Sequence, residues 1–346
     1  MVKSDFEKIL LEYDYKLPES FIAQNPVHPR DSAKLLVYDR KSKNISVDTF
    51  KNLGNYLSPN SVLVFNNTKV IPARVIGQKP TGGKVDLLFI RKEGEKLIFW
   101  ANKKLEKGLI ITAGEYFFKV ILKQDKEYSL KPSFPVNSYL RVFEEIGITP
   151  LPPYIKHTTI KGKKLREEYQ TVFAKNEGSV AAPTASLHFT RHLMKKLQKQ
   201  GHLICFITLH VNLGTFAPLR EEQYKLQKLH EEFYEIDTAT AKLLNNARKE
   251  GRSIVAIGTT VVRALESSSD SHGIVQKLSG KTNLFITAKT KLKCTDQVIT
   301  NFHVPKSSLL MLVAAFTGRK QLLRLYKVAQ EKTFRFFSFG DGMFIR

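Results

Sequence analysis

The segment TRHLMKKLQKQGHLICFITLHV, residues 190–211, has the pattern of a helix followed by a buried strand. Thr190 can cap a helix whose apolar face runs from Leu193 to Leu197, and Gly201 can end that helix. The apolar run that follows suits a strand that is covered on both faces. A helix followed directly by a buried strand is typical of layered α/β domains.

The same pattern occurs in two further places. Asp237 can cap a second helix that ends at Gly251, and SIVAIGTT (253–260) then has the composition of another buried strand. SVLVFN, residues 61–66, is a third apolar run of this kind. These strands and helices predict an α/β layered domain.

A different pattern separates the first of these strands from the others. From residue 75 to about 130 the chain consists of short β-rich runs, divided by GG, EG, KG and AG turns at intervals of roughly ten residues. The prolines of TPLPPY (149–154) cannot continue a central strand, so they mark the exit from this unit. We therefore expect a discontinuous α/β catalytic domain, residues 1–74 and 151–346, with an inserted small antiparallel β-barrel domain, residues 75–150.

The chain is strongly basic. Its 55 Lys and Arg residues against 32 Asp and Glu residues give a formal net charge of +23. Such a charge favours nucleic acid first and an anionic membrane second, although a lysine-rich proteome is an alternative cause. Residues 271–330 carry ten Lys and Arg against one acid, Asp296. Within this region we expect RNA contacts from Lys289, Lys291 and Lys293.

Composition also excludes several classes of protein. The two cysteines, Cys205 and Cys294, are too few for a disulfide framework or a thiolate zinc site, so we expect no metal and a cytoplasmic location. The N-terminal segment has acids where a signal peptide needs an apolar core. The longest apolar run, residues 309–316, is much shorter than a ~20-residue membrane span, so we expect no membrane segment.

The common catalytic motifs are absent from the sequence. Gly280, Lys281 and Thr282 resemble the end of a phosphate-binding loop, but Val275 stands where the first glycine of that loop would be. No G-x-G-x-x-G opens a predicted helix, and no G-x-S-x-G, H-E-x-x-H or paired C-x-x-C motif occurs. Kinase, Rossmann dehydrogenase, α/β-hydrolase and zinc-enzyme functions are therefore disfavoured.

Polar, ring-bearing and small residues gather where predicted strands end, in segments 181–190, 208–218, 257–267 and 300–308. Ligands of open α/β sheets bind beyond the carboxyl ends of the strands, so we expect these segments to form one site. His210 alone would more often be a buried core histidine, but His188 and His303 recur in the same setting. Arg263 could bind a ligand, or it could form an internal ion pair with Glu266 on a solvated helix face.

Ten segments resemble, in order and over nearly the whole chain, those of the S-adenosylmethionine:tRNA ribosyltransferase-isomerases of queuosine biosynthesis. They are PRDSAKLLVYDR (29–40), VFNNTKVIPAR (64–74), GGKVDLLFIR (82–91), LPPYI (151–155), YQTVFA (169–174), VAAPTASLHFT (180–190), TLHVNLGTFAP (208–218), AIGTTVVRALES (256–267), TNFHVPKSSLLMLVAAFTG (300–318) and FRFFSFGDGMFI (334–345). The resemblance implies an α/β domain joined to an inserted β-barrel.

The resemblance also implies a tRNA-modifying transferase and isomerase. Members of this family use S-adenosylmethionine as a ribosyl donor, not as a methyl donor. The acceptor is 7-aminomethyl-7-deazaguanine at the tRNA wobble position, and the products are epoxyqueuosine-tRNA, adenine and methionine. The expected partners are therefore tRNA and S-adenosylmethionine, with no prosthetic group and with a monomer as the expected state.

This chemistry needs a base that removes a proton from the ribose 5′ carbon, which the sulfonium acidifies, and an acid that helps adenine to leave. A neutral histidine suits the base, and an imidazolium or a tyrosine suits the acid. The candidates are His188, His210, His230, His303 and Tyr169. The candidates for substrate binding are Arg30, Asp31, Asn66, Thr68, Arg74, Pro183, Thr184, Thr215, Phe216, Thr259, Thr260, Arg263, Glu266, Asn301 and His303.

The sequence departs from the family pattern in places. Asn67 stands where we expect Asp, so one potential carboxylate base is missing. The other departures are Ser186 and Asn212 for Gly, Glu231 and Val261 for Ser, and Phe339 for Tyr.

Two other functions compete with this one. A non-catalytic protein that binds tRNA or other structured RNA would explain the charge, but not the polar residues at the strand ends. An RNA methyltransferase is disfavoured, because no glycine-rich loop follows the first strand of an α/β run.

Overall fold

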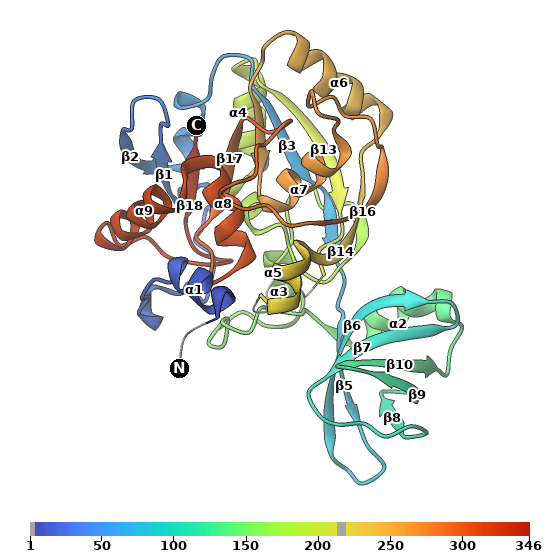
Figure 1. Ribbon diagram of the computed structural model, residues 1–346. Coiled ribbons are helices and arrows are strands. Elements are labelled where there is room, and N and C mark those ends of the chain that lie inside the picture. The colour runs from blue at the N-terminus through green and yellow to red at the C-terminus, as the bar shows by residue number, and fades with distance from the viewer. Residues whose placement is uncertain (1–3, 213–218) are drawn as a thin grey trace.

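A mixed sheet of nine strands forms the centre of the larger domain (Figure 1). The computed structural model describes residues 4–212 and 219–346. The strands of this sheet are β1 (Lys34–Tyr38), β2 (Ile45–Thr49), β3 (Val62–Asn66), β13 (Leu203–Leu209), β14 (Lys228–Glu235), β15 (Ile254–Ile257), β16 (Ser279–Leu284), β17 (Gln297–Asn301) and β18 (Gly342–Ile345). Their order is β16-β14-β13-β3-β15-β17-β18-β1-β2.

The parallel centre of this sheet consists of the strands that the sequence predicts. β3 pairs in parallel with both β13 and β15, and β15 pairs in parallel with β17. All residues of β3 and β15 are buried, as expected for strands that are covered on both faces. The α/β class is therefore confirmed. The sequence did not predict the antiparallel additions, β14 and β16 at one edge and β18 against β17.

Helices cover both faces of the sheet (Figure 1). Residues of α6, α7, α8 and α9 pack with Val64 and Ile207 on one face, whereas α4, η3 and η5 pack with Phe65 and Val255 on the other. No helix in the described ranges is long and apolar enough to cross a bilayer. The helices of this domain are α1 (Asp5–Glu12), η1 (Glu19–Phe21), η2 (Arg30–Ser32), η3 (Phe50–Asn55), α3 (Gly162–Glu168), η5 (Thr184–His188), α4 (Arg191–Lys199), α5 (Glu221–Leu226), α6 (Thr238–Lys249), α7 (Thr259–Ser268), α8 (Ser308–Thr317) and α9 (Arg319–Glu331).

The ends of α4 and α6 follow from local chemistry. The Thr190 hydroxyl accepts a hydrogen bond from the backbone N–H of Leu193 at 3.0 Å, and the Asp237 carboxylate caps α6 in the same way. Gly201 and Gly251, just beyond the two helices, have φ of +89° and +68°, a region that favours glycine. Both helix predictions are confirmed.

The second domain is a closed antiparallel β-barrel. Six strands follow the order β5-β6-β7-β10-β9-β8, and a pairing of Gln78 with Thr112 joins β8 back to β5. The predicted barrel is therefore confirmed. Its elements are β5 (Arg74–Gln78), β6 (Lys84–Glu93), β7 (Lys96–Ala101), β8 (Ile110–Ala113), β9 (Tyr116–Gln124), β10 (Glu127–Pro132), η4 (Val136–Ser138), α2 (Tyr139–Ile146) and β11 (Gly147–Ile148). A parallel ribbon of β4 (Thr68–Val70) and β12 (Asn176–Ser179) lies where the barrel joins the larger domain.

The barrel has its own apolar core. The predicted domain boundaries can therefore be tested by removing the barrel. Its two chain ends meet, because Ile148 of β11 pairs with Arg74 of β5. We expect a variant in which a short Gly-Ser linker replaces residues 75–150 to keep a cooperative urea transition, with a smaller m-value because less surface becomes exposed on unfolding. Loss of a single cooperative transition in far-UV circular dichroism would show that the two domains do not fold separately.

Candidate active site

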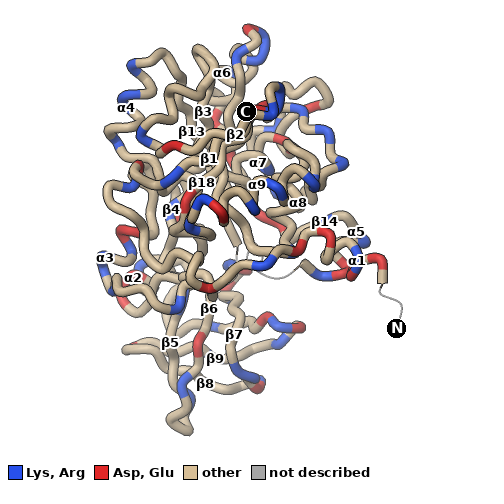
Figure 2. Tube along the Cα trace, turned by 90° about the vertical axis from the view of Figure 1, so that its left-hand side faces the viewer, with Lys and Arg blue, Asp and Glu red and all other residues tan. Residues whose placement is uncertain are grey.

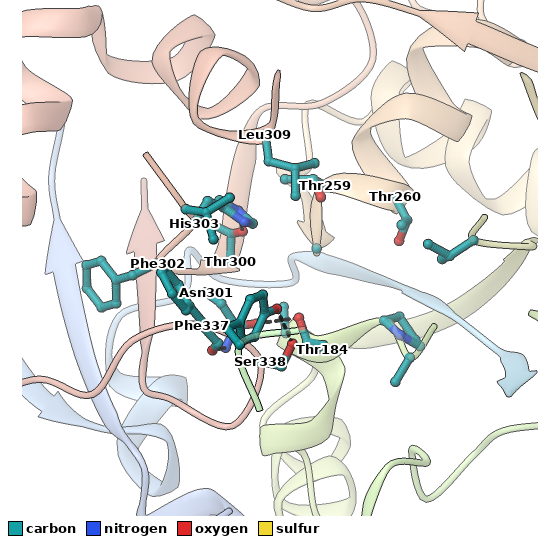
Figure 3. Close-up of a pocket in the computed structure, with 17 residues that line it drawn as sticks. Thr184, Thr259, Thr260, Thr300, Asn301, Phe302, His303, Leu309, Phe337 and Ser338 are labelled. Atoms are coloured by element: carbon teal, nitrogen blue, oxygen red, sulfur yellow. Dashed lines mark hydrogen bonds between the residues drawn. The ribbon is translucent and has the colours of Figure 1, made fainter. Parts of the chain in front are cut away.

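A pocket opens at the carboxyl edge of the sheet, beyond the ends of β13, β15 and β17 (Figure 3). All four strand-end segments that the sequence predicted to converge contribute to it. Its lining consists of Tyr154, Ala182, Pro183, Thr184, Ala185, Val211, Gly258, Thr259, Thr260, Thr300, Asn301, Phe302, His303, Val304, Leu309, Phe337 and Ser338, and we call it the edge pocket.

Hydrogen bonds between neighbours orient the polar lining of the edge pocket. The Thr184 hydroxyl donates to Asn301 Oδ1 at 2.9 Å, and the Asn301 amide donates to the Phe337 carbonyl at 3.1 Å (Figure 3). The hydroxyls of Tyr154 and Ser338 lie 2.7 Å apart. The predicted residues Thr184 and Asn301 therefore form one hydrogen-bonded part of the wall of the edge pocket. Tyr154 and Ser338 were not selected from the sequence, although both lie in segments that resemble the family.

The first turn of α7 forms another part of the lining. Gly258 precedes the helix with φ of +99° and supplies no capping side chain, and Thr259 and Thr260 follow it in the pocket. The first N–H groups of a helix lack partners within the helix and carry partial positive charge. This end of α7 therefore favours an anionic group on a ligand in the edge pocket.

A second cavity lies between the barrel and the larger domain, and we call it the interdomain cleft. Arg91, Trp100 and Tyr139 line it from the barrel, and His210 and His230 line it from the larger domain. Trp100 is the only tryptophan of the chain. The sequence predicted no function for the three barrel residues, because the pattern of a strand or a helix does not show which part of the other domain it will face.

His210 directly follows β13, and its neighbours along the chain line both cavities. Its side chain lines the cleft, whereas the next residue, Val211, lines the edge pocket. Its Nδ1 lies 2.8 Å from the Thr68 hydroxyl, and its ring passes so close to Gly178 that a Cβ there would come within about 3.0 Å of it. Burial lowers the pKa of His210, and the nearby Glu235 carboxylate partly opposes this effect. A neutral, oriented imidazole is the form that accepts a proton.

Asn66 holds the strand end that carries His210. Its amide oxygen accepts hydrogen bonds from the backbone N–H groups of Leu209 and Thr68 at 3.0 and 3.1 Å, and its amide nitrogen donates to the Leu209 carbonyl at 2.9 Å. The same nitrogen donates to the Thr260 hydroxyl at 3.3 Å. Asn66 and Thr68 thus position other residues and do not line either cavity.

His188 is buried, whereas His303 is half-buried and lies in a different position. Burial, with the charges of Arg335 and Arg30, lowers the pKa of His188 to about 3. The His188 ring stacks on Phe50 at 4.1 Å, and its Nε2 lies 3.3 Å from the Asn301 amide, behind the pocket wall. Burial also lowers the pKa of His303 to about 3, but this residue lines the edge pocket and lies 2.7 Å from the Thr300 hydroxyl.

The other two catalytic candidates do not line the edge pocket. Tyr169 is fully buried, its ring packs edge-on against Phe339 at 5.9 Å, and burial raises the pKa of its hydroxyl. It is not among the lining residues of the edge pocket. His230 lines the interdomain cleft, where burial lowers its pKa.

Arg263 forms a buried ion pair, but not with the partner considered from the sequence. Its Nη1 donates to Glu232, its Nε donates to the Leu284 carbonyl at 3.3 Å and its Nη2 donates to the Thr282 carbonyl at 3.3 Å. Because Arg263 is only 4% exposed, the solvated helix face is wrong. Glu266 instead accepts from the backbone N–H groups of residues 293–295 at 2.7 to 3.1 Å.

The three predicted RNA-binding lysines lie beyond β16. Lys289 and Lys291 are exposed, and Lys293 is held through its backbone N–H by Glu266. Glu266 follows Thr259 by seven residues along α7, so this contact lies about 10 Å along the helix from the edge pocket.

The remaining candidates lie outside both cavities or outside the described residues. Arg30 donates to the carbonyls of residues 167, 168 and 170, and Asp31 accepts from the Thr190 hydroxyl at 2.8 Å. Arg74 Nε lies 3.6 Å from Asp86 at the start of the barrel. Thr215 and Phe216 lie outside the described residues. Within the described ranges, no group of three or more His, Cys, Asp or Glu residues could hold a metal ion.

Comparison with known proteins agrees with the family that the sequence resembles. The sequence profile of a family described as queuosine biosynthesis protein matches residues 10–345. The chain belongs to this family. The S-adenosylmethionine:tRNA ribosyltransferase-isomerase of Caldanaerobacter subterraneus subsp. tengcongensis is 44% identical to it over 342 residues, which cover 96% of this chain and 98% of the relative.

Two further relatives extend this similarity. The protein of the same name from Aquifex aeolicus is 43% identical over 337 residues, covering 96% of this chain and 98% of its own length. The crystal structure of the S-adenosylmethionine tRNA ribosyltransferase of Thermotoga maritima matches with a TM-score of 0.56 at 32% identity, covering 97% of this chain and all of that one. The expected family and the expected enzyme class are therefore confirmed.

Proposed function

We propose that this protein transfers and isomerises the ribosyl group of S-adenosylmethionine onto 7-aminomethyl-7-deazaguanine at the wobble position of tRNA. The products are epoxyqueuosine-tRNA, adenine and methionine. The observation that carries this proposal is the full-length similarity to relatives that bear this enzyme name. The cytoplasmic location, the monomeric state and the absence of a prosthetic group remain predictions from the sequence.

We place the donor in the edge pocket. The rings of Tyr154 and Phe337, with centroids 4.7 Å apart, supply an apolar wall for the adenosyl group. The first turn of α7 supplies N–H groups for the methionine carboxylate. In this arrangement the helix end binds the anion for which the sequence suggested Arg263.

We assign the first proton transfer to His210. Its neutral ring removes a proton from the ribose 5′ carbon, where the sulfonium stabilises the resulting carbanion. The bond from the ribose to adenine then breaks, and a proton donor neutralises the departing base. As adenine leaves, the electron pair of the carbanion opens the sugar ring and the ring oxygen becomes a carbonyl. The aminomethyl nitrogen of the acceptor then adds to the sugar and loses a proton, which restores the carbanion. This carbanion bonds to the carbonyl carbon, and the resulting alkoxide closes the epoxide as the carbon–sulfur bond breaks and methionine leaves. His230 is a candidate for the donor, since it lines the interdomain cleft.

Mass analysis of the products distinguishes this function from its alternatives. The protein is incubated with S-adenosylmethionine and tRNA that carries the aminomethyl-deazaguanine base. The proposal predicts free adenine together with a ribosyl-derived mass gain on the tRNA. A gain of one methyl group would indicate a methyltransferase. Unchanged tRNA that nevertheless binds the protein would indicate a non-catalytic RNA-binding function.

Lys289, Lys291 and Lys293 are proposed to contact tRNA phosphates. Changing all three to Glu should weaken binding of substrate and non-substrate tRNA alike, because phosphate contacts carry no sequence information. Each lost contact should also flatten the log–log salt dependence of binding by roughly 0.7 to 0.9. Filter binding across a salt series measures both effects, and an unchanged affinity would refute the assignment.

A further inference from the structure

A basic groove lies between α3, α4 and the junction with the barrel. Its basic lining residues are Lys69 on β4, Lys163 and Arg166 on α3, and Arg191 at the start of α4. We call it the α3–α4 groove. In Figure 2, Lys and Arg positions follow each other from α4 to α3 along one side of the molecule.

The groove keeps an excess of positive charge after its internal ion pairs are counted. Glu144 pairs with Arg166 at 2.7 Å and Glu177 pairs with Lys69 at 2.8 Å, and Glu167 is the third carboxylate in the lining. Residues 156–200 contain ten Lys and Arg against three Asp and Glu. The exposed bases on and beside the groove are Lys161, Lys163, Lys164, Arg191, Lys195 and Lys199.

Two residues selected from the sequence hold the groove together. Arg30 donates to the carbonyls at the end of α3 and to the Glu168 carboxylate, while Asp31, its neighbour, accepts from the hydroxyl of Thr190, which caps α4. One short 3₁₀ turn, η2, therefore fixes the end of α3 relative to the start of α4. These contacts give Arg30 and Asp31 a structural role that does not require contact with a small ligand.

The groove is continuous with the interdomain cleft. Glu177, on the β4–β12 ribbon, lines both, and Lys69 lies opposite it on the ribbon. A strand that leaves the cleft and crosses this ribbon enters a surface with an excess of Lys and Arg. Phosphate groups are the ligands that such a surface stabilises most.

We propose that the α3–α4 groove binds the phosphate backbone of the RNA strand next to the reacting nucleotide. This inference rests on the proposed function only in taking RNA as the partner. It adds a second contact surface, on a different part of the chain from Lys289, Lys291 and Lys293. Because the contacts are to phosphate, they position the RNA and do not select its sequence.

The test compares two triple variants that each remove three positive charges. The groove variant is K163Q/R191Q/K195Q, and the matched control is K43Q/K242Q/K249Q, whose positions lie on the β1–β2 turn and α6, at the end of the larger domain remote from the barrel (Figure 1). The probe is an unmodified tRNA transcript, and fluorescence anisotropy across a salt series gives its affinity. We expect the groove variant to lose roughly tenfold or more in affinity, and its salt slope to flatten by about 2.

The tRNA affinity of the control variant should stay within about twofold of that of the parent protein. Its three charges lie far from the proposed RNA site and act only through screened long-range forces. The variant K163R/R191K/K195R keeps the three positive charges and should retain the tRNA affinity of the parent protein. Retained affinity would show that the loss in the groove variant comes from the missing charge and not from replacing these side chains. Equal losses in the groove and control variants, or no loss in either, would overturn the proposal. Since binding is measured without turnover, failure of the proposed reaction would leave this result interpretable.

Discussion

His210→Ala should lower turnover by roughly a hundredfold or more, because general base catalysis contributes about that much to a rate. The affinity for tRNA should stay nearly unchanged, since His210 is one half-buried side chain among many contacts. The structure favours His210 over His188, because His210 lines the interdomain cleft, whereas His188 is buried behind Asn301 and lines neither cavity. Single-turnover kinetics with saturating tRNA measure the effect on chemistry directly.

The pH profile gives an independent test of the same assignment. A base works in its neutral form, and burial lowers the pKa of His210 below its ordinary value. The rate should therefore be flat at neutral pH and fall only as the pH drops through the lowered pKa of His210. His272→Ala is the matched control, because His272 is an exposed histidine that lines neither cavity. Parent-like turnover in His210→Ala would exclude this residue as the base.

Arg263→Met should destabilise the protein by about 3 to 5 kcal/mol, because it removes the cation beside a buried carboxylate. Glu232 is 2% exposed and also accepts from the backbone N–H of Asn212 at 3.1 Å, so the pair joins α7 to the strand end near the cleft. The double variant Glu232→Met/Arg263→Met should recover part of this loss of stability. Urea unfolding gives the free energy of unfolding of the parent protein, the single variant and the double variant.

The sequence-based hypothesis for Arg263 gives a different result. If Arg263 holds an anionic group of the ligand, Arg263→Lys should raise the KM for S-adenosylmethionine and leave the free energy of unfolding nearly unchanged, because only the planar fork is lost. If the ion pair with Glu232 is structural, Arg263→Lys should instead lower the free energy of unfolding and leave the KM for S-adenosylmethionine near its parent value. Comparing the two quantities in one variant decides between the roles.

The sequence predicted the strands and helices whose form depends mainly on their own residues. The apolar runs of β3, β13 and β15 need cover on both faces, and the caps at Thr190 and Asp237 set the starts of α4 and α6. The antiparallel edges were not predicted, because β14 has the alternating and charged composition of an exposed segment, KLHEEFYE. Its place beside β13 depends on tertiary contacts.

The candidate site was predictable as a location but not as a set of contacts. The carboxyl ends of parallel strands meet at one edge, so residues 182–185, 258–260 and 300–304 converge as expected. Which side chains face the pocket depends on packing across segments far apart in the sequence. Thus Arg263 faces Glu232, and Asn66 holds a neighbouring strand, although both lie in segments that resemble the family.

In the proposed reaction, S-adenosylmethionine supplies its ribose and not its methyl group to the tRNA. The most direct measurement uses two preparations of S-adenosylmethionine, one labelled in the ribose and one labelled in the methyl group, each incubated with tRNA that carries the aminomethyl-deazaguanine base. We expect the ribose label to enter the tRNA and the methyl label to appear in free methionine. Methyl label in the tRNA, or ribose label that stays with adenosine-containing products, would contradict the claim.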